Sequence, residues 1–570
     1  MRMIYNMKYP AIDALMSDCQ MGARKKKGCK NNIFIINGII HDVLKSKKNN
    51  PVLLQIYDYQ QMFDSIDLEE ALSDIYDTGV DDDTLALLYQ ANKEIHMAVK
   101  TPGGLTNRQI LRNIVLQGDT WGSILASVQV DKIGKECMAE GHAYLYKNCL
   151  PVGFLGLVDD IIGVTEAGLK AQKMNAFINL KTAEKTLQFG PSKCNSMLIG
   201  KNTEYVVNSP IMVDNWTVEY MENRETGEVD LKEHYAGLVE VEKTDEQKYL
   251  GFVVSCQGNN MANIRQIEKK SIGVVRKVIN KLNSLNLGKY YFECSIILMN
   301  VILRGSILYA CEMYYNLKES ELRKIEQIEE GFMRNVLNTP KGCPTTQLYL
   351  ELGQIPARFE IQKMRLLYLK YILNEEEDSL LRKFFMLQLE KSSKGDWAWT
   401  CVEDLRALNI TESFDEIKNM TKIKFSRILK SRTRQNALKY LIEKRKSKGK
   451  EIIYSEISMA EYMLPTNTKL SIYQKQTLFS IRNRMIDIPS NFSKTNKEVK
   501  CICGNLENMK HIYECEILNN GKDHKQKYKK LFEGRIDEQI EVFYIFEKNL
   551  KRREKLKLKN MNVHHHVINL

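Results

Sequence analysis

The 570-residue sequence has no window of about 18 uncharged apolar residues, the length that a membrane-spanning helix needs. It also has no N-terminal signal peptide, low-complexity segment or convincing internal repeat. Its 13 cysteines are an odd number, scattered through helical and strand patterns, which argues against a disulfide framework. We therefore expect reduced thiols in the nucleus and cytoplasm, with no membrane partner and no secretion.

The excess of positive charge is moderate, so its placement matters more than its size. The chain has 83 Lys and Arg against 71 Asp and Glu, a formal net charge of +12. Twelve Lys and Arg and one acid, Glu443, lie between Lys422 and Lys450. This segment predicts a phosphate-binding surface, although a solvated helix face would have the same composition.

The stretch Phe154–Val164 carries two adjacent carboxylates, Asp159 and Asp160, inside an apolar run that favours strands. Charge is costly near a core unless a partner neutralises it, and no basic residue lies beside the pair. A tight hairpin with the two acids at its tip, facing a divalent metal, resolves this conflict. The alternative is a plain surface turn.

A second acid, Asp58, lies at the end of the apolar strand predicted over Val52–Tyr59. A helix that begins at Asp67, with Glu70 three residues on, follows as a variant capping box. Catalytic acids on α/β scaffolds lie at such strand ends. Three carboxylates that converge from adjacent strands could hold two Mg²⁺ ions, which would serve phosphoryl transfer onto the end of a nucleic acid. The three are Asp58, Asp159 and Asp160.

The remaining patterns predict further helices and strands. Between the two acid-bearing segments we expect a helix after Asp81–Asp83, then two strand-like arms around a Pro102–Gly104 turn, and a helix after a Gln-Gly turn. Downstream we expect a helix, two strand regions, and then a helical pattern that Pro340 interrupts. The ranges are 33–44 for an early helix, 95–99 and 113–116 for the arms, 124–130 and 167–187 for helices, and 196–199 and 248–254 for strands.

With these motifs in order, the chain resembles the reverse transcriptase of a non-LTR, LINE-type retrotransposon. The first palm motif of that family matches Asp58, Phe63 and Asp64. The other matches are Gln117–Gly118, Asp159–Asp160, Lys193, the primer-grip segment Tyr249–Leu250–Gly251 and the finger motif Ser17–Arg24. The resemblance covers about residues 17–340.

The resemblance implies a role for each matched residue. Asp58 and Asp159 would be Mg²⁺ ligands with the Tyr59 carbonyl, Asp160 a weaker third acid, and Lys193 a general acid for pyrophosphate. Phe63 would be the steric gate that selects deoxynucleotides, or else a plain core aromatic. Gln117 and Gly118 would abut the incoming nucleotide and template, and Tyr249, Leu250 and Gly251 would form the primer grip.

The same resemblance implies an α+β fold: a right-hand polymerase palm and fingers, a helical thumb and a mostly helical C-terminal region. The expected boundaries are 1–55 for partial fingers, 56–257 for the palm with interleaved fingers elements, 258–340 for the thumb, 341–500 for a basic helical linker region, 501–515 for a zinc knuckle and 516–570 for a basic tail. The expected partners are an RNA template, a DNA primer or target, and dNTPs.

Near the C-terminus, Cys501, Cys503, His511 and Cys515 supply three thiolates and one imidazole, a tetrahedral zinc complement. The family has a Cys-Cys-His-Cys knuckle at this place, usually with two residues between the first pair instead of one. We expect Zn²⁺ here, with reduced free thiols as the alternative.

The sequence departs from the family before Gln20, where the basic front of the fingers is not recognisable, and it has no recognisable endonuclease. We therefore expect an N-terminally truncated RNA-directed DNA polymerase that performs target-primed reverse transcription. The alternatives are a catalytically inactive nucleic-acid-binding remnant of such an element, and a group II intron maturase, against which the Cys-His knuckle speaks.

Overall fold

The computed structural model describes residues 1–46, 51–112, 114–200, 210–222, 229–446, 470–483, 485, 500–521, 530–533 and 535–567. The chain divides into two compact units that alternate along the sequence. Unit 1 comprises Met1–Gln266, Ala310–Lys318 and Arg365–Lys422, and unit 2 comprises Ile267–Tyr309, Glu319–Met364 and Ile423–Leu570. Within the described residues, every helix is too short or too polar to cross a membrane.

A five-stranded sheet in the order β13-β10-β1-β9-β8 forms the centre of unit 1. The central strand β1 runs antiparallel to both neighbours, β9 and β10, and β8 forms a hairpin with β9. The strands are β1 Val52–Tyr57, β8 Phe154–Leu157, β9 Asp160–Glu166, β10 Asn195–Ile199 and β13 Glu242–Lys243. The strands predicted over Val52–Tyr59 and 196–199 and the hairpin at Phe154–Val164 are thus confirmed.

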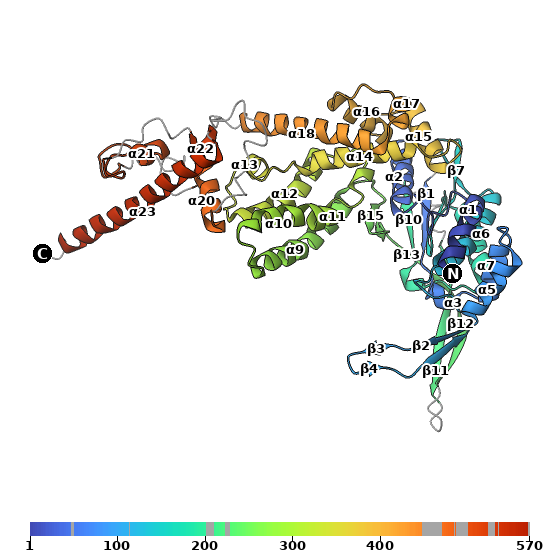
Figure 1. Ribbon diagram of the computed structural model, residues 1–570. Helices are drawn as coiled ribbons and strands as arrows, with labels where there is room; N and C mark the ends of the chain where they lie inside the picture. Colours follow the sequence, from blue (N-terminus) through green and yellow to red (C-terminus); the bar gives the residue numbers. More distant parts are fainter. Residues whose placement is uncertain are drawn as a thin grey trace. The chain divides into compact units, whose positions relative to one another are not determined.

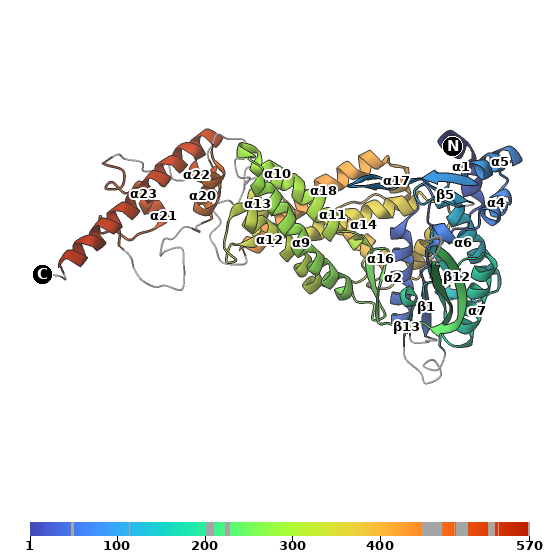
Figure 2. The same ribbon diagram turned by 90° about the horizontal axis from the view of Figure 1, so that it is seen from below.

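Helices cover both faces of this sheet, which explains why all six residues of β1 are buried. Helix α2 (Cys29–Lys45) lies on one side, and α6 (Gly122–Ala139) and α7 (Leu169–Glu184) lie on the other, as Figures 1 and 2 show from two directions. Leu53 and Tyr57 of β1 pack into the core on the α6 and α7 side. The helices predicted over 33–44, 124–130 and 167–187 are confirmed.

Two of the other helices of unit 1, α4 and α5, begin where the sequence predicts them. The side chains of Asp67 and Asp81 accept hydrogen bonds from backbone N–H groups and so cap α4 and α5. The helices are α1 Arg2–Leu15, α3 Met62–Ser65, α4 Leu68–Tyr76, α5 Asp82–Asn92, η1 Pro191–Lys193, η4 Cys311–Met313, α15 Leu380–Glu390, α16 Trp397–Ala407 and α17 Phe414–Asn419.

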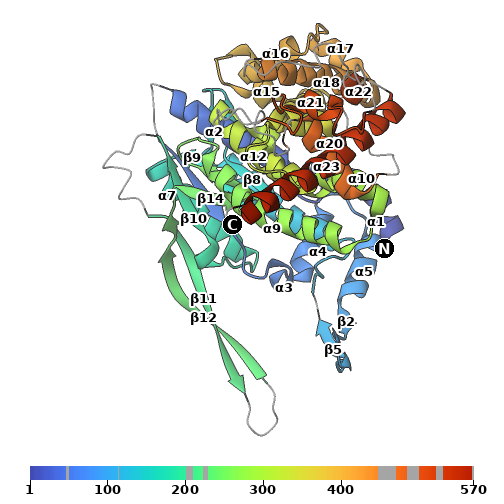
Figure 3. The same cartoon turned by 90° about the vertical axis from the view of Figure 1, so that its left-hand side faces the viewer.

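Two hairpins project from unit 1 (Figure 3). One pairs β2 (Glu94–Met97) with β5 (Gln109–Arg112) and ends in the short pair β3 (Lys100–Thr101) and β4 (Gly104–Leu105). The other pairs β11 (Met212–Glu222) with β12 (Val229–Glu240). The expected arm over 113–116 is wrong. Residue 113 lies outside the described residues, and Val115 is buried in the core instead of pairing, so its apolar character reflects packing.

Two small hairpins complete the β-structure of unit 1. Strands β6 (Tyr144–Tyr146) and β7 (Leu150–Val152) pair antiparallel, as do β14 (Glu246–Tyr249) and β15 (Phe252–Ser255). The second of these confirms the strand and turn predicted over 248–254.

Unit 2 consists mainly of helices in its described residues, with an isolated β-bridge between Lys500 and Leu506. Helices α9 (Met261–Ser284) and α14 (Ala357–Leu373) are shared between the units. The others are η2 Gly288–Tyr290, α10 Tyr291–Leu298, the π-helix η3 Met299–Leu303, α11 Arg304–Ile307, α12 Glu319–Leu337, α13 Thr345–Glu351, α18 Lys422–Lys446, α20 Ile472–Arg482, α21 Met509–Glu514, α22 Lys530–Glu533 and α23 Ile536–Val567. Helix α12 ends at Leu337, before Pro340, as expected.

Candidate active site and metal centre

Asp58 and Asp160 lie at the same end of two neighbouring strands. The last paired residues of β1 and β9 are Tyr57 and Ile161, so Asp58 follows one strand end while Asp160 begins the other strand. Asp160 also pairs with Leu157 across the β8–β9 hairpin, which leaves Val158 and Asp159 as the two turn residues. The sheet thus brings together the three acids that the sequence predicted.

The turn between β8 and β9 holds a valine in an unfavourable conformation. Val158 has φ +60°, in the left-handed region that β-branched residues rarely adopt. Such a conformation costs about 1–2 kcal/mol and persists only where surrounding contacts enforce it. The strained residue directly precedes Asp159, so whatever holds Val158 also fixes the direction of the two acids.

The acids oppose one another electrostatically. Burial, with the nearby charges of Asp159 and Asp58 adding to it, raises the pKa of the Asp160 carboxyl to about 6. Burial and the charge of Asp58 also raise the pKa of Asp159. Like charges held this close favour protonation unless a cation joins them, so the donor set suits a divalent metal.

Lys193 is the residue that supplies positive charge to this cluster. Its Nζ lies 3.1 Å from Asp58 Oδ1, and 63% of its side chain is exposed. It ends the short helix η1, and the Gly190 N–H just before that helix donates to the Asp58 carbonyl at 2.9 Å. The structure therefore brings Lys193 to the acids, as the family resemblance implied.

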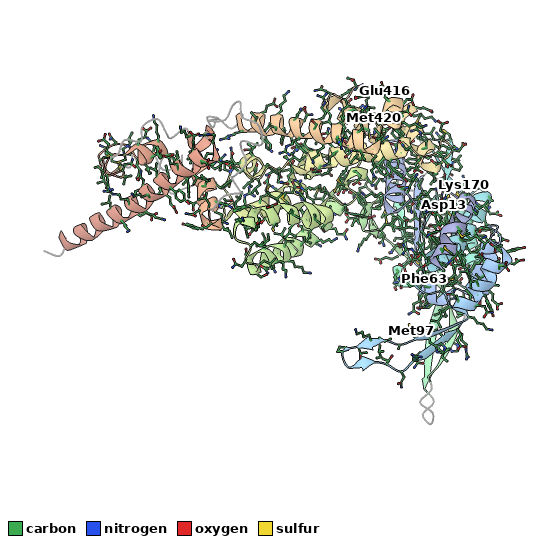
Figure 4. All side chains as sticks on the ribbon, in the orientation of Figure 1. Asp13, Phe63, Met97, Lys170, Glu416 and Met420 are labelled. Carbon is green, nitrogen blue, oxygen red and sulfur yellow. The ribbon has the colours of Figure 1, made fainter. Side chains whose placement is uncertain are left out.

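Tyr59 and Phe63 follow Asp58 in different environments. The Tyr59 ring is buried and stacks on Phe189 with 4.9 Å between centroids, so only its backbone can face the acids. Phe63, on α3, is partly exposed and packs against the core beneath it. Figure 4 labels Phe63 on the part of unit 1 from which the hairpin with Met97 projects.

Gln117 and Gly118 form an exposed turn just before α6. Gly118 has φ +88°, which a glycine adopts without strain, and the Asp119 carboxylate accepts a hydrogen bond from the Trp121 N–H at 3.1 Å. The turn is therefore held at the start of α6, a largely buried helix, by a side-chain hydrogen bond.

Tyr249, Leu250 and Gly251 form the tight turn between β14 and β15. Leu250 and Gly251 both have positive φ angles, as a two-residue hairpin turn requires. Tyr249 is buried, and the charge of Asp160 is among the causes that, after burial, raise the pKa of its hydroxyl. The expected primer-grip turn thus lies within electrostatic reach of the acids.

Two side chains for which the sequence predicted no individual role hold this site together, although one of them, Gln20, lies in the finger motif Ser17–Arg24. Asn32 Nδ2 donates to the Gly156 carbonyl of β8 at 3.2 Å and to the Tyr249 hydroxyl at 3.1 Å. Gln20 is buried and binds the backbone of Val158. Asn32 adjoins an apolar run, which is a weak signal for a buried polar group, whereas the signal for Gln20 is its place in the finger motif.

In unit 2, the four predicted zinc ligands converge. Their ligand atoms all lie within 4.8 Å of one another, with Cys501 Sγ 3.8 Å from Cys515 Sγ and Cys503 Sγ 3.1 Å from His511 Nε2. The single residue between the first two cysteines is accommodated by a turn, in which the Cys501 N–H donates to the Asn505 carbonyl at 2.8 Å. Helix α23 supports the cluster because Asn549 Nδ2 donates to the Ile512 carbonyl at 3.0 Å.

Helix α18 carries the basic segment predicted from the sequence, and residues 447–450 of that segment lie outside the described residues. Six of its cations are exposed and pair with no acid of the described chain: Lys422, Arg427, Lys430, Arg432, Arg434 and Lys439. Its buried side, at a spacing of four residues, consists of Phe425, Leu429, Thr433, Ala437 and Leu441.

Comparison with known proteins bears on the first half of the chain. Residues 1–254 match the family described as reverse transcriptase (RNA-dependent DNA polymerase). This part of the chain is therefore similar to that family, and its acid-bearing sheet with the flanking helices has a palm and fingers architecture. No curated protein sequence matches the chain.

Among solved structures, the chain is similar to two telomerases described in complex with a TWJ fragment of telomeric RNA. The Candida albicans protein shares 11% sequence identity over 67% of this chain, with a TM-score of 0.28. The Candida tropicalis protein shares 11% identity over 70% of this chain, with a TM-score of 0.30. The chain spans about half of each, 56% of their length.

Proposed function

We propose that the chain is the RNA-directed DNA polymerase of a non-LTR retrotransposon, and that it performs target-primed reverse transcription with two Mg²⁺ ions. The observation that carries this proposal is the meeting of Asp58 with Asp159 and Asp160 at one end of the sheet. The match of residues 1–254 to the reverse transcriptase family supports it. The non-LTR assignment rests on the order of the sequence motifs.

The three carboxylates fit a pair of magnesium ions. They supply hard oxygen ligands, burial and the charge of Asp58 raise the pKa values of Asp159 and Asp160, and Lys193 offsets only part of the negative charge. Bound ions would supply Lewis-acid charge to the primer 3′-hydroxyl and to the leaving pyrophosphate. Asp58 and Asp159 would hold them with the Tyr59 carbonyl, and Asp160 would be the weaker third ligand.

Other residues of the chain would donate a proton, select the sugar and contact the nucleotide, template and primer. Lys193 holds a proton on Nζ at the exposed rim of the cluster, where it can reach pyrophosphate as a general acid. Phe63, partly exposed on α3, would occupy the space that a ribose 2′-hydroxyl needs. The fixed turn at Gln117 and Gly118 would contact the nucleotide and template, and the Tyr249–Gly251 turn would hold the primer.

Zinc at the Cys501, Cys503, His511 and Cys515 cluster would be structural. Thiolates and imidazole prefer Zn²⁺, and four ligands close its tetrahedral shell and leave no open position for chemistry. The exposed cations of α18 would bind phosphates of the RNA template, which is the partner that a reverse transcriptase requires.

Primer extension with the purified chain tests the proposal. The assay supplies an RNA template, an annealed DNA primer, dNTPs and Mg²⁺, with the Asp159→Asn/Asp160→Asn variant as the control. We expect incorporation by the wild type and none by the variant. If the wild type binds RNA but incorporates no dNTP, the chain is a nucleic-acid-binding remnant. A nicked DNA end as primer tests the target-primed reaction separately.

A further inference from the structure

The finger motif Ser17–Arg24 lies directly against the hairpin that carries the acids. The Met21 N–H donates to the Gly156 carbonyl at 2.9 Å, and the Gly156 N–H donates to the Cys19 carbonyl at 2.8 Å. These two bonds add the finger segment to β8 as a short parallel pairing. The segment is therefore part of the architecture of the acidic hairpin.

The side-chain amide of Gln20 extends this pairing by two residues, because it forms hydrogen bonds with the backbone of Val158. Its Oε1 accepts a hydrogen bond from the Val158 N–H at 3.0 Å, and its Nε2 donates toward the Val158 carbonyl at 3.4 Å. The same Oε1 accepts from the Gly22 N–H at 2.7 Å, which fixes the orientation of the amide. Gln20 thus satisfies both backbone groups of one turn residue from a fully buried position.

Two glycines provide the space that this contact needs. A Cβ at Gly22 would come within 2.2 Å of the Val158 nitrogen, and a Cβ at Gly156 would come within 2.9 Å of Gln20 Nε2. Neither position can accept a side chain without moving the turn or the amide. The absence of side chains at Gly22 in the finger segment and at Gly156 in β8 therefore allows Gln20 to lie this close to the turn.

The finger segment is itself anchored elsewhere in unit 1. The Ser17 N–H donates to both carboxylate oxygens of Asp131 in α6, at 3.0 and 3.1 Å. The Arg24 guanidinium closes the loop by donating to the Gln20 carbonyl at 3.2 Å and to Asp13 Oδ1 at 2.6 Å. Because these anchors are buried or partly buried, Gln20 can resist a movement of the turn.

We propose that Gln20 is a positioning residue for the acidic turn: it holds Val158 in its left-handed conformation and so sets the separation of Asp159 and Asp160 from Asp58. Gln20 touches no acid itself and acts through one backbone unit. Only the consequence of this role for catalysis rests on the proposed function. The effects of Gln20 on the turn and on metal binding can be measured without polymerase activity.

The test compares Gln20→Met, which keeps the volume and removes the hydrogen bonds, with Gln388→Met. Gln388 is a matched control because it is equally buried in the same unit, donates to Tyr315 at 2.7 Å and accepts from Ala398 at 3.2 Å, outside the acidic hairpin. Hydrogen exchange over residues 154–164 is the first readout. We expect exchange there to rise about tenfold or more in Gln20→Met and to stay unchanged in Gln388→Met.

Binding of Mn²⁺ alone, measured by calorimetry or electron paramagnetic resonance, is the second readout. We expect Gln20→Met to weaken Mn²⁺ binding about tenfold. Adding Val158→Gly should restore most of the affinity, because glycine adopts a positive φ without help from Gln20. A merely structural role for Gln20 would not be rescued by this second change.

The inference is overturned if Gln20→Met leaves hydrogen exchange in the hairpin and Mn²⁺ affinity as in the wild type. It is also overturned if Gln388→Met weakens Mn²⁺ binding equally, or if Val158→Gly restores nothing. A wild type that binds Mn²⁺ but incorporates no dNTP would contradict the polymerase assignment and leave the role of Gln20 to these measurements.

Discussion

Asn32 joins Tyr249 to Gly156: one buried amide nitrogen donates to the hydroxyl of the expected primer-grip turn and to the carbonyl of the strand that leads to the acids. The two hairpins are not paired with each other in the sheet. Asn32 is therefore a direct hydrogen-bonded link between the two hairpins.

Replacing Asn32 should weaken the grip on the primer. Asn32→Leu removes the donor of the buried Tyr249 hydroxyl and one of the two donors of the Gly156 carbonyl, which keeps the Met21 N–H, at a cost of about 1–3 kcal/mol in stability. In steady-state primer extension we expect the KM for primer to rise more than kcat falls, because Asn32 donates to Gly156 and Tyr249 and to none of the three acids. Asn31→Leu is the control, since Asn31 Nδ2 donates to Tyr371 at 2.9 Å and to neither hairpin. An equal change in both variants would contradict this role.

The raised pKa of Asp160 makes stability depend on pH. A carboxyl whose pKa is about 6 in the folded state, above its ordinary value of about 4, binds its proton more tightly when folded. Its contribution to stability is therefore fully present below about pH 4 and is lost as the pH rises through about 6.

Asp160→Asn removes this dependence, so the variant should be more stable than the wild type at pH 7.5, by about 1 kcal/mol once solvent screening of the partly exposed group is considered. The difference should vanish near pH 4. Urea denaturation at the two pH values measures it, with the exposed residue change Asp378→Asn as the control. A variant that is less stable at pH 7.5 would contradict the electrostatic account.

Shortening Phe63 should relax the choice of sugar. Phe63→Val opens space beside the site, so we expect the preference for dNTP over rNTP in kcat/KM to fall about 10- to 100-fold. Phe177→Val is the control, because Phe177 is also a partly buried phenylalanine against the same core. Unchanged discrimination in Phe63→Val would identify Phe63 as a plain core aromatic.

The Cys-His cluster should hold one zinc ion per chain. We expect Cys503→Ser to lose the metal and to increase hydrogen exchange in α21 and α23, which the cluster and Asn549 join. Metal analysis and exchange measurements check this, and Cys149→Ser, at an exposed cysteine of unit 1, is the control. Wild-type protein without zinc after purification in zinc-containing buffer would contradict the assignment.

The unpaired cations of α18 should govern the salt dependence of RNA binding. Each phosphate contact on a single strand contributes about 0.7 to the slope of log affinity against log salt. Replacing four cations by glutamine should therefore lower the slope by about 3. The four are Arg427, Lys430, Arg434 and Lys439.

The control for the α18 variant replaces four exposed cations that already pair with acids and are not free to bind phosphate. These are Lys170, Lys383, Arg406 and Lys551. We expect the salt slope to stay near that of the wild type. An equal loss in both variants would identify net charge, and not the α18 surface, as the cause.

The sequence predicts the strands that carry the acids because their patterns are local. An apolar run that ends in Asp58, and an apolar run split by Asp159 and Asp160, each encode a strand end by a short, nearly continuous apolar stretch that stops at polar turn residues. The N-caps Asp67 and Asp81 are local as well, and the structure has both.

Long-range contacts are not encoded in this way. Gln20 lies in a polar segment far from Val158 in the sequence, and nothing in either neighbourhood indicates that the two meet. The arm expected over 113–116 fails for a related reason. An apolar run reports burial, and Val115 is buried by packing in the core and not by pairing in a sheet.

The bonds between Cys19, Met21 and Gly156 have one more effect. Strand β8 is the outermost strand of the five-stranded sheet, and on its outer side the finger segment occupies the backbone groups of Gly156. An edge strand whose backbone N–H and C=O groups are unpaired can form hydrogen bonds with another chain, which leads to aggregation. The few residues that orient the acids therefore also cover the edge of the sheet and prevent it from pairing with another molecule. A shortened form that begins after Arg24 would have both an exposed edge strand that promotes aggregation and a less firmly held acidic turn.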